Sequence, residues 1–154
     1  EFPNLVMLRT FSKAGTLAGL RVGYCAASPD IAEQIAKAKL PYNLNFFSMA
    51  VAAMVVRNWH RFEPVIARIR SERERVYAAL GNMAGVRVYP SAANFLLFET
   101  DRPPAEVFRG VYDRGVLIRD VSKYPLLGKA LRVSIGTPEE NDAFLSALRA
   151  TLGA

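Results

Sequence analysis

Two short apolar runs near the start of the chain enclose a polar segment that carries a lysine, an arginine and several glycines. The first run covers residues 5–8 (LVML) and the second covers residues 20–27. Short apolar runs bounded by turn-forming residues are typical of buried β-strands. We therefore expect two buried strands, joined by a loop that fixes Lys13 and Arg21 in space.

The residues between these strands combine an amine with groups that bind phosphate. Lys13 is a primary amine that can condense with an aldehyde, and the planar guanidinium of Arg21 can hold a phosphate through two parallel hydrogen bonds. Hydroxyls stand beside the lysine at Thr10 and Ser12. Pyridoxal phosphate carries both an aldehyde and a phosphate. The segment therefore predicts a covalent anchor for this cofactor.

Residues 12–24 read SKAGTLAGLRVGY. This segment resembles the anchor sequence of the fold type I pyridoxal-phosphate enzymes, and within them that of the histidinol-phosphate aminotransferases most closely. The resemblance implies that Lys13 binds the cofactor covalently and moves a proton between substrate and cofactor. It also implies that Thr10, Ser12 and Arg21 bind the cofactor phosphate. A solvated lysine at a loop tip is the alternative interpretation of Lys13.

The same resemblance implies an α/β fold of the fold type I transferase kind. Residues 1–56 would be the C-terminal part of the large cofactor-binding domain, residues 57–81 a bridging helix, and residues 82–154 a small α+β domain. The chain opens with Glu1 and reaches Lys13 after only twelve residues. No candidate is found for the family's glycine-rich phosphate loop, stacking aromatic or ring-nitrogen aspartate. We therefore expect a C-terminal part of a longer enzyme, inactive by itself and at best a weak binder of the cofactor.

Helical and strand periodicity organises the rest of the chain. A helix is expected after Ser28, with Pro29 in its first turn. A long helical stretch is expected over residues 46–80, apolar on nearly every face in its first half, and Pro64 should kink or split it. The inner stripe of its second half is predicted to consist of Val65, Ile69, Val76 and Leu80. Further strands are predicted over residues 86–90, 94–99, 116–120 and 130–136, with helices over residues 104–114 and after the capping box of residues 137–140.

Two arginines interrupt predicted strands of the small domain. Arg132 lies in the run LRVSIG and Arg119 in the run VLIRD. A guanidinium in an apolar strand is costly unless an anion or a carboxylate pairs with it. In the resembled family, the arginine at the position of Arg132 binds the acidic end of the substrate, and a second arginine, which Arg119 matches less closely, shares a phosphate with it. The alternative is a structural ion pair, for which the candidate carboxylates are Glu99, Asp113 and Asp120.

Two arginines at the substrate end would suit a phosphorylated amine. The resemblance implies amino transfer between histidinol phosphate and 2-oxoglutarate, a 2-oxo acid, by a homodimeric enzyme of histidine biosynthesis. A decarboxylase of a phosphorylated amino acid, an aromatic aminotransferase and a non-catalytic binding module are the alternatives. Asn94 precedes an apolar strand, and it would either line the substrate pocket or form a turn.

Composition excludes several other classes of protein. The formal net charge is +6, but the basic residues are scattered, and those from Arg68 to Arg75 alternate with acidic ones, which is typical of a solvated helix face and not of a nucleic-acid site. The longest apolar stretch, residues 46–56, is shorter than the roughly 20 residues of a membrane span. Cys25 is the only cysteine, and a small buried thiol is expected there. We therefore expect a cytoplasmic protein with no nucleic-acid, membrane or metal site.

Overall fold

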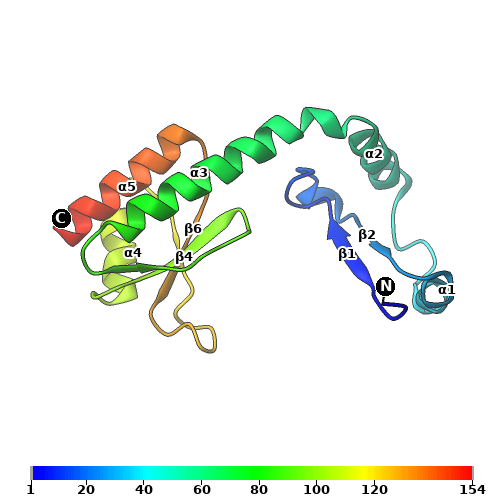
Figure 1. The fold of residues 1–154 in the computed structure, drawn as a ribbon, viewed down its shortest axis with the longest axis horizontal. Helices are drawn as coiled ribbons and strands as arrows, with labels where there is room; N and C mark the ends of the chain where they lie inside the picture. The colour runs from blue at the N-terminus through cyan, green and yellow to red at the C-terminus, as the bar shows by residue number, and fades with distance from the viewer. Residues whose placement is uncertain (1, 154) are drawn as a thin grey trace. The chain divides into compact units, whose positions relative to one another are not determined.

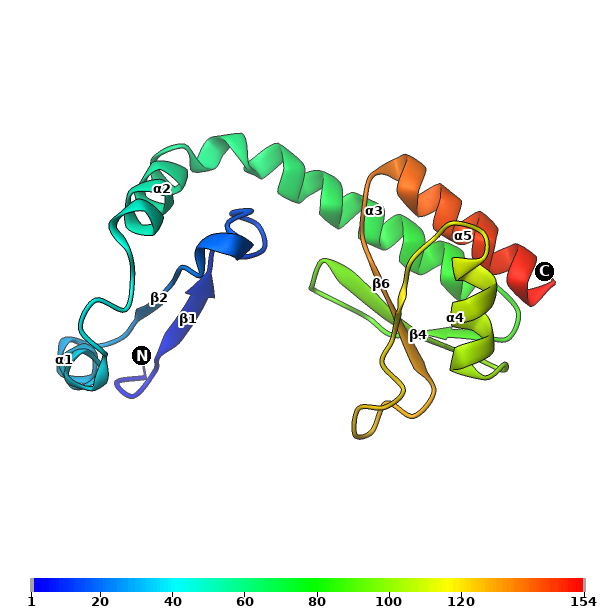
Figure 2. The same ribbon diagram turned by 180° about the vertical axis from the view of Figure 1, so that it is seen from behind.

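The computed structural model describes residues 2–153. The chain divides into two compact units, Glu1–Ile66 and Ala67–Ala154. Within the described residues, the first unit contains a two-stranded sheet and the second a four-stranded sheet. Figures 1 and 2 show the two units from opposite sides. Each unit has its own hydrophobic core.

The first unit is built on a β-hairpin. Its elements are β1 (Met7–Thr10), the 3-10 turn η1 (Ala18–Leu20), β2 (Gly23–Ala26), α1 (Pro29–Ala38), α2 (Phe46–Arg57) and the 3-10 turn η2 (Trp59–Arg61). The two strands pair antiparallel, with Thr10 opposite Gly23 at the end that carries the loop. Helix α1 begins at Pro29 as predicted. Helix α2 is capped by Asn45, whose side-chain oxygen accepts a hydrogen bond from the backbone N–H of Ser48 at 2.8 Å.

Burial of the two strands differs from the prediction. Every residue of β1 and β2 is exposed, including Cys25, whose thiol was expected to be buried. An apolar strand pair is buried only when further strands or helices cover its faces. Among residues 2–66, β1 and β2 pair only with each other, so the expectation of two buried strands is wrong for this unit.

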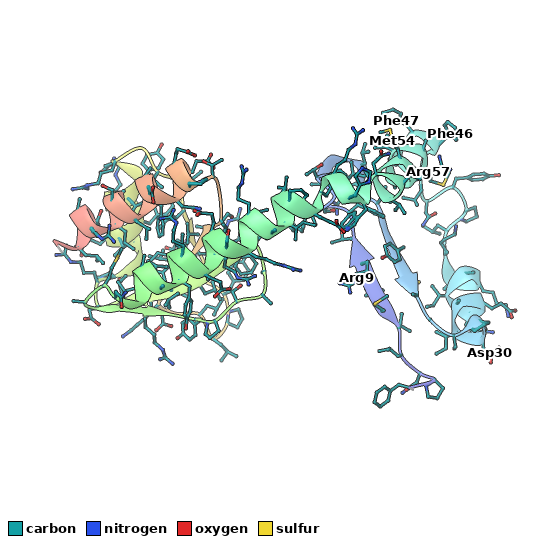
Figure 3. All side chains as sticks on the ribbon, turned by 45° about the horizontal axis from the view of Figure 1, so that its top comes forward. Arg9, Asp30, Phe46, Phe47, Met54 and Arg57 are labelled. Carbon is teal, nitrogen blue, oxygen red and sulfur yellow. The ribbon has the colours of Figure 1, made fainter. Side chains whose placement is uncertain are left out.

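Helix α2 is also exposed on much of its apolar surface. Its buried residues are Ser48, Ala52 and Val55. Figure 3 shows Phe46, Phe47 and Met54 on this helix, and all three side chains are more than half exposed. No helix among residues 2–153 is both long enough and apolar enough to cross a membrane.

The helical stretch predicted over residues 46–80 forms two helices. Helix α2 is followed by η2, and α3 (Glu63–Gly81) then begins, with Pro64 in its first turn. A proline there sacrifices no intrahelical hydrogen bond, because the N–H groups of a first turn have no partner in the helix. The chain therefore breaks before Pro64. Val65, which was predicted to face inward, is 54% exposed, so this part of the predicted stripe is wrong.

The second unit contains a sheet that buries one face. Its strands are β3 (Val86–Val88), β4 (Phe95–Thr100), β5 (Arg119–Asp120) and β6 (Ala130–Ser134), and its further helices are α4 (Pro104–Tyr112) and α5 (Pro138–Leu152). The strand order is β3-β4-β6-β5, with every neighbouring pair antiparallel. Helix α5 lies beside α3 in both views (Figures 1 and 2), and a side-chain hydrogen bond joins these two helices.

Strand β4 shows how the sheet is oriented. Leu96, Phe98 and Thr100 are buried, whereas the residues between them are partly exposed. Because side chains alternate between the faces of a strand, one face of the sheet meets the core and the other stays open. The core behind the sheet also contains Val76, Leu80, Val107, Val111, Leu131, Phe144 and Leu148.

Candidate functional site

Lys13 and Arg21 lie in the connection between β1 and β2. The strand pairing continues one step beyond both strands, because the N–H of Phe11 donates to the carbonyl of Val22 at 3.1 Å. Both of these side chains are buried in the core of the first unit. These two residues pair at the base of the connection, so both ends of the loop between them are held in place.

A tight turn presents Lys13. The N–H of Thr16 donates to the carbonyl of Lys13 at 2.9 Å, and the N–H of Leu17 donates to the carbonyl of Phe11 at 2.9 Å. Gly15 packs against the same carbonyl, so that a Cβ at this position would lie 2.9 Å from the oxygen of Phe11. This contact is shorter than real Cβ atoms adopt. The turn therefore requires a glycine two residues after the lysine.

Donors that suit a phosphate stand in the same connection. The N–H of Ser12 donates to Oγ1 of Thr10 at 3.1 Å, which places the two hydroxyl residues side by side. Arg21 adopts the left-handed backbone conformation, with φ 54°, and its Nη1 donates to the carbonyl of Ala18 at 2.9 Å. Among residues 2–153, neither Lys13 nor Arg21 takes part in an ion pair. One amine, two hydroxyls and a guanidinium are the donor set that a phosphorylated aldehyde requires.

The open face of the second sheet carries two facing arginines. Arg119 of β5 lies directly opposite Arg132 of β6, and Leu97 of β4 lies opposite Arg132 on its other side. Residues directly opposite across antiparallel strands have Cβ atoms about 5 Å apart, and like charges in such a pair repel each other. The pair is therefore a place where an anion would be stabilised.

The carboxylates named as structural partners do not neutralise this pair. Asp113 forms an ion pair with Arg109, whose Nε lies 2.9 Å from Oδ1 and donates a hydrogen bond to Oδ2 at 3.1 Å. Asp120 accepts one from the N–H of Ser122 at 2.8 Å, and its hydrogen bonds with Ser122 hold the pKa of its carboxyl below the usual value. Glu99 forms no ion pair with either arginine. Within the described part of the chain, the alternative of a structural ion pair at these two arginines is thus unsupported.

Arg132 is held against an aromatic ring. Its Cζ lies 5.2 Å from the ring centroid of Phe95. Its Nε is buried and has no hydrogen-bond partner among residues 2–153. Buried donors without a partner are rare in proteins. Sequence reasoning missed Phe95, because its place beside Arg132 depends on the pairing of β4 with β6; the alternation of residues 95, 97 and 99 on one strand face was the available signal.

The predicted site residues thus fall into two groups. Lys13 and its phosphate-binding candidates share one loop of the first unit, whereas Arg119 and Arg132 share one sheet face of the second. Asn94 is exposed and precedes β4, and its carbonyl accepts a hydrogen bond from the N–H of Ile135 at 2.9 Å. It therefore extends the ladder between β4 and β6. No cluster of three acidic, histidine or cysteine side chains among residues 2–153 could hold a metal ion.

Comparison with known proteins supports the sequence resemblance. A family model described as aminotransferase class I and II matches residues 1–148. Over 153 residues the chain is 44% identical to histidinol-phosphate aminotransferase 2 of Cupriavidus pinatubonensis (strain JMP 134 / LMG 1197). The matched region covers 99% of this chain and 41% of that protein.

Solved structures show the same relationship. The L-threonine-O-3-phosphate decarboxylase from Porphyromonas gingivalis is similar with a TM-score of 0.86 and 28% identity, over 99% of this chain and 48% of that one. The histidinol-phosphate aminotransferase from Sinorhizobium meliloti, in complex with pyridoxal-5'-phosphate, is similar with a TM-score of 0.78 and 27% identity. This match covers 98% of this chain and 42% of that one. The predicted α/β fold class is confirmed, and the chain spans less than half the length of each of these proteins.

Proposed function

Because the chain belongs to the aminotransferase class I and II family, we propose that it forms the C-terminal part of a pyridoxal-phosphate-dependent aminotransferase. The observation that carries this proposal is the loop between β1 and β2, in which Lys13 stands among the phosphate donors Thr10, Ser12 and Arg21. A non-catalytic binding module is disfavoured by the presence of Lys13, since a family member that had lost its activity would be expected to lose this lysine first.

The residues of the loop have separate roles. Arg21 and the hydroxyls of Thr10 and Ser12 would hold the phosphate of the cofactor and so keep it in place. Lys13 would bind the cofactor through Nζ. In its neutral form, the same Nζ takes a proton from the substrate carbon and returns it in the reverse direction. When bound, pyridoxal phosphate supplies an electron sink for the negative charge that develops at the substrate carbon.

The open face of the second sheet binds the acidic end of the substrate. Arg119 and Arg132 face each other across β5 and β6, and a phosphate monoester with two negative charges would relieve their repulsion. Asn94, at the end of the same sheet, lines the substrate site. The 44% identity to a histidinol-phosphate aminotransferase supports histidinol phosphate and 2-oxoglutarate as the substrate pair, which places the enzyme in histidine biosynthesis.

The exposed apolar surface supports the placement of the chain within a larger protein. Residues 1–56 belong to a large domain, residues 57–81 to a bridging helix and residues 82–154 to a small domain. The exposed strands β1 and β2 and the exposed side of α2 are surfaces that the rest of the enzyme and a second subunit of a homodimer cover. Taken alone, the chain is inactive. A cytoplasmic location agrees with its single unpaired cysteine.

A decarboxylase of a phosphorylated amino acid is the second candidate, because one of the similar solved structures has that activity. An assay of the whole enzyme distinguishes the aminotransferase from the decarboxylase. Incubated with histidinol phosphate and 2-oxoglutarate, an aminotransferase forms glutamate and releases no carbon dioxide. Release of carbon dioxide from a phosphorylated amino acid, without glutamate formation, would reject the proposed transfer. An aromatic aminotransferase would instead form glutamate from an aromatic amino acid faster than from histidinol phosphate.

A further inference from the structure

We infer that Phe95 is a positioning residue of the anion site, whose ring aims the guanidinium of Arg132 at an anion on the open face of the second sheet. The inference deepens the proposed function and rests on it in one respect, namely that Arg132 binds the acidic end of the substrate.

Strand register brings the ring and the guanidinium to the same face. Arg132 lies opposite Leu97, and Phe95 lies opposite Ser134 in the same antiparallel pair. Phe95 is therefore the diagonal neighbour of Arg132, a spacing within reach of aromatic and long side chains. The distance of 5.2 Å between Cζ of Arg132 and the ring centroid lies within the roughly 6 Å over which a cation and a ring face attract each other.

The other neighbours of Arg132 cannot hold it. Arg119, directly opposite on β5, carries a like charge, and Leu97, opposite on β4, has no polar atom in its side chain. The buried Nε of Arg132 has no acceptor among the described residues. The ring of Phe95 is thus the attractive contact that the structure gives this guanidinium within residues 2–153.

This contact determines which donors meet a ligand. Because Nε is buried, the two Nη nitrogens form the end of the guanidinium that a ligand can reach. The guanidinium is planar by itself, so a ring contact that restrains its position also restrains the direction of both Nη groups, which can then make a paired contact to two oxygens of a phosphate. Without the ring, the long side chain would lose rotamer freedom each time it bound an anion, and affinity would fall accordingly.

Inorganic phosphate is a suitable probe for the full 154-residue chain. Its affinity can be measured by titration while the Nε–Hε signals of the arginines are followed by nuclear magnetic resonance. Loss of a ring contact of this kind should weaken binding by about 2- to 30-fold. We therefore expect Phe95→Leu to weaken phosphate binding within that range and to abolish the ring-current shift of the Arg132 signal. Phe95→Tyr, which keeps a ring face, should restore both.

Phe108→Leu is the matched control. Phe108 is a partly buried phenylalanine of the same unit that stacks on Tyr112 with ring centroids 6.2 Å apart. The same substitution there should leave phosphate affinity and the Arg132 signal unchanged.

The outcomes separate this inference from the proposed function. If Arg132→Met leaves phosphate affinity unchanged, the proposed substrate end is wrong, and the role of Phe95 is rejected with it. If Arg132→Met abolishes binding while Phe95→Leu binds as the unmodified chain does, only the role of Phe95 is rejected. The unmodified chain provides a test that needs no variant: an Arg132 signal without a ring-current shift would also overturn the inference.

Discussion

The carboxylate of Glu72 accepts a hydrogen bond from Nδ2 of Asn141 at 2.8 Å, and this contact joins helix α3 to helix α5. Both residues are buried, with 9% of Glu72 and 3% of Asn141 exposed. Asn141 also pairs with the backbone of Gly136, accepting from its N–H at 3.0 Å and donating to its carbonyl at 3.2 Å. The turn that follows β6, the strand of Arg132, is therefore attached to α3.

Asn141→Ala should destabilise the chain. It leaves the backbone of Gly136 and one side of the buried Glu72 carboxylate without a partner, and an unsatisfied buried polar group costs about 1–3 kcal/mol. Urea unfolding followed by circular dichroism measures the loss. The control is Asp142→Ala at the next position. Its side chain is 65% exposed and pairs with Arg75, and loss of an exposed ion pair should reduce stability far less. Equal losses for the two variants would contradict a special role for Asn141.

Glu72 should make stability depend on pH in the acidic range. Hydrogen bonds from Arg75 and Asn141 hold the pKa of its carboxyl below the ordinary value of 4.5. A lowered pKa in the folded state means that this stabilisation is fully present above pH 4.5 and is lost as pH falls through the folded-state pKa. Glu72→Gln should therefore lower stability at neutral pH and flatten its decline toward acid. Glu106→Gln, on the exposed side of α4, is the control, and an unchanged acid slope in Glu72→Gln would argue against the mechanism.

Lys13→Ala in the whole enzyme should abolish covalent attachment of pyridoxal phosphate, because the turn at Gly15 presents no other amine. Borohydride reduction followed by peptide mass spectrometry identifies the lysine that carries the cofactor. The control is Lys37→Ala, which removes an exposed lysine paired with Glu33 at 2.8 Å. Cofactor trapped at a different lysine in the unmodified enzyme would refute the assignment of Lys13.

Arg21→Lys and Arg132→Lys should damage different properties of the whole enzyme. Lysine keeps the charge of arginine but loses its paired hydrogen bonds. At Arg21 the change should weaken cofactor retention, and at Arg132 it should raise the KM for a phosphorylated substrate by about 10- to 100-fold with cofactor retained. Spectroscopic titration of the cofactor and steady-state kinetics distinguish the two variants, and loss of cofactor from Arg132→Lys would move this residue to the cofactor site.

The isolated chain should self-associate through helix α2 and the strands around Lys13. Phe46 is 81% exposed and Phe47 is 66% exposed, and apolar surface of this extent normally finds a partner. Replacing both by serine should shift sedimentation toward the monomer. Leu126→Ser, at a fully exposed apolar side chain of the second unit, is the control. A compact monomer of the unmodified chain with these segments ordered would contradict the prediction.

Local patterns in the sequence were sufficient to predict several structural features of this protein. The start of α1 at Pro29 and the capping box of Thr137 and Glu140 were predicted and are observed. The loop that carries Lys13 was predicted as well, whereas Arg21, which lies within the predicted strand of residues 20–27, precedes the observed start of β2 at Gly23. Features of this kind depend on residues a few positions apart in the chain, where the backbone itself brings the groups together.

Contacts between distant segments were decided only by the tertiary structure. The facing of Arg119 and Arg132, the ring of Phe95 beside the guanidinium and the bond between Glu72 and Asn141 all depend on strand register or helix packing. A shift of one residue in register would reverse every side chain of a strand, so no local pattern specifies these pairs. Burial is equally nonlocal: β1 and β2 have the sequence of buried strands, yet they are exposed because no further strand among the described residues pairs with them.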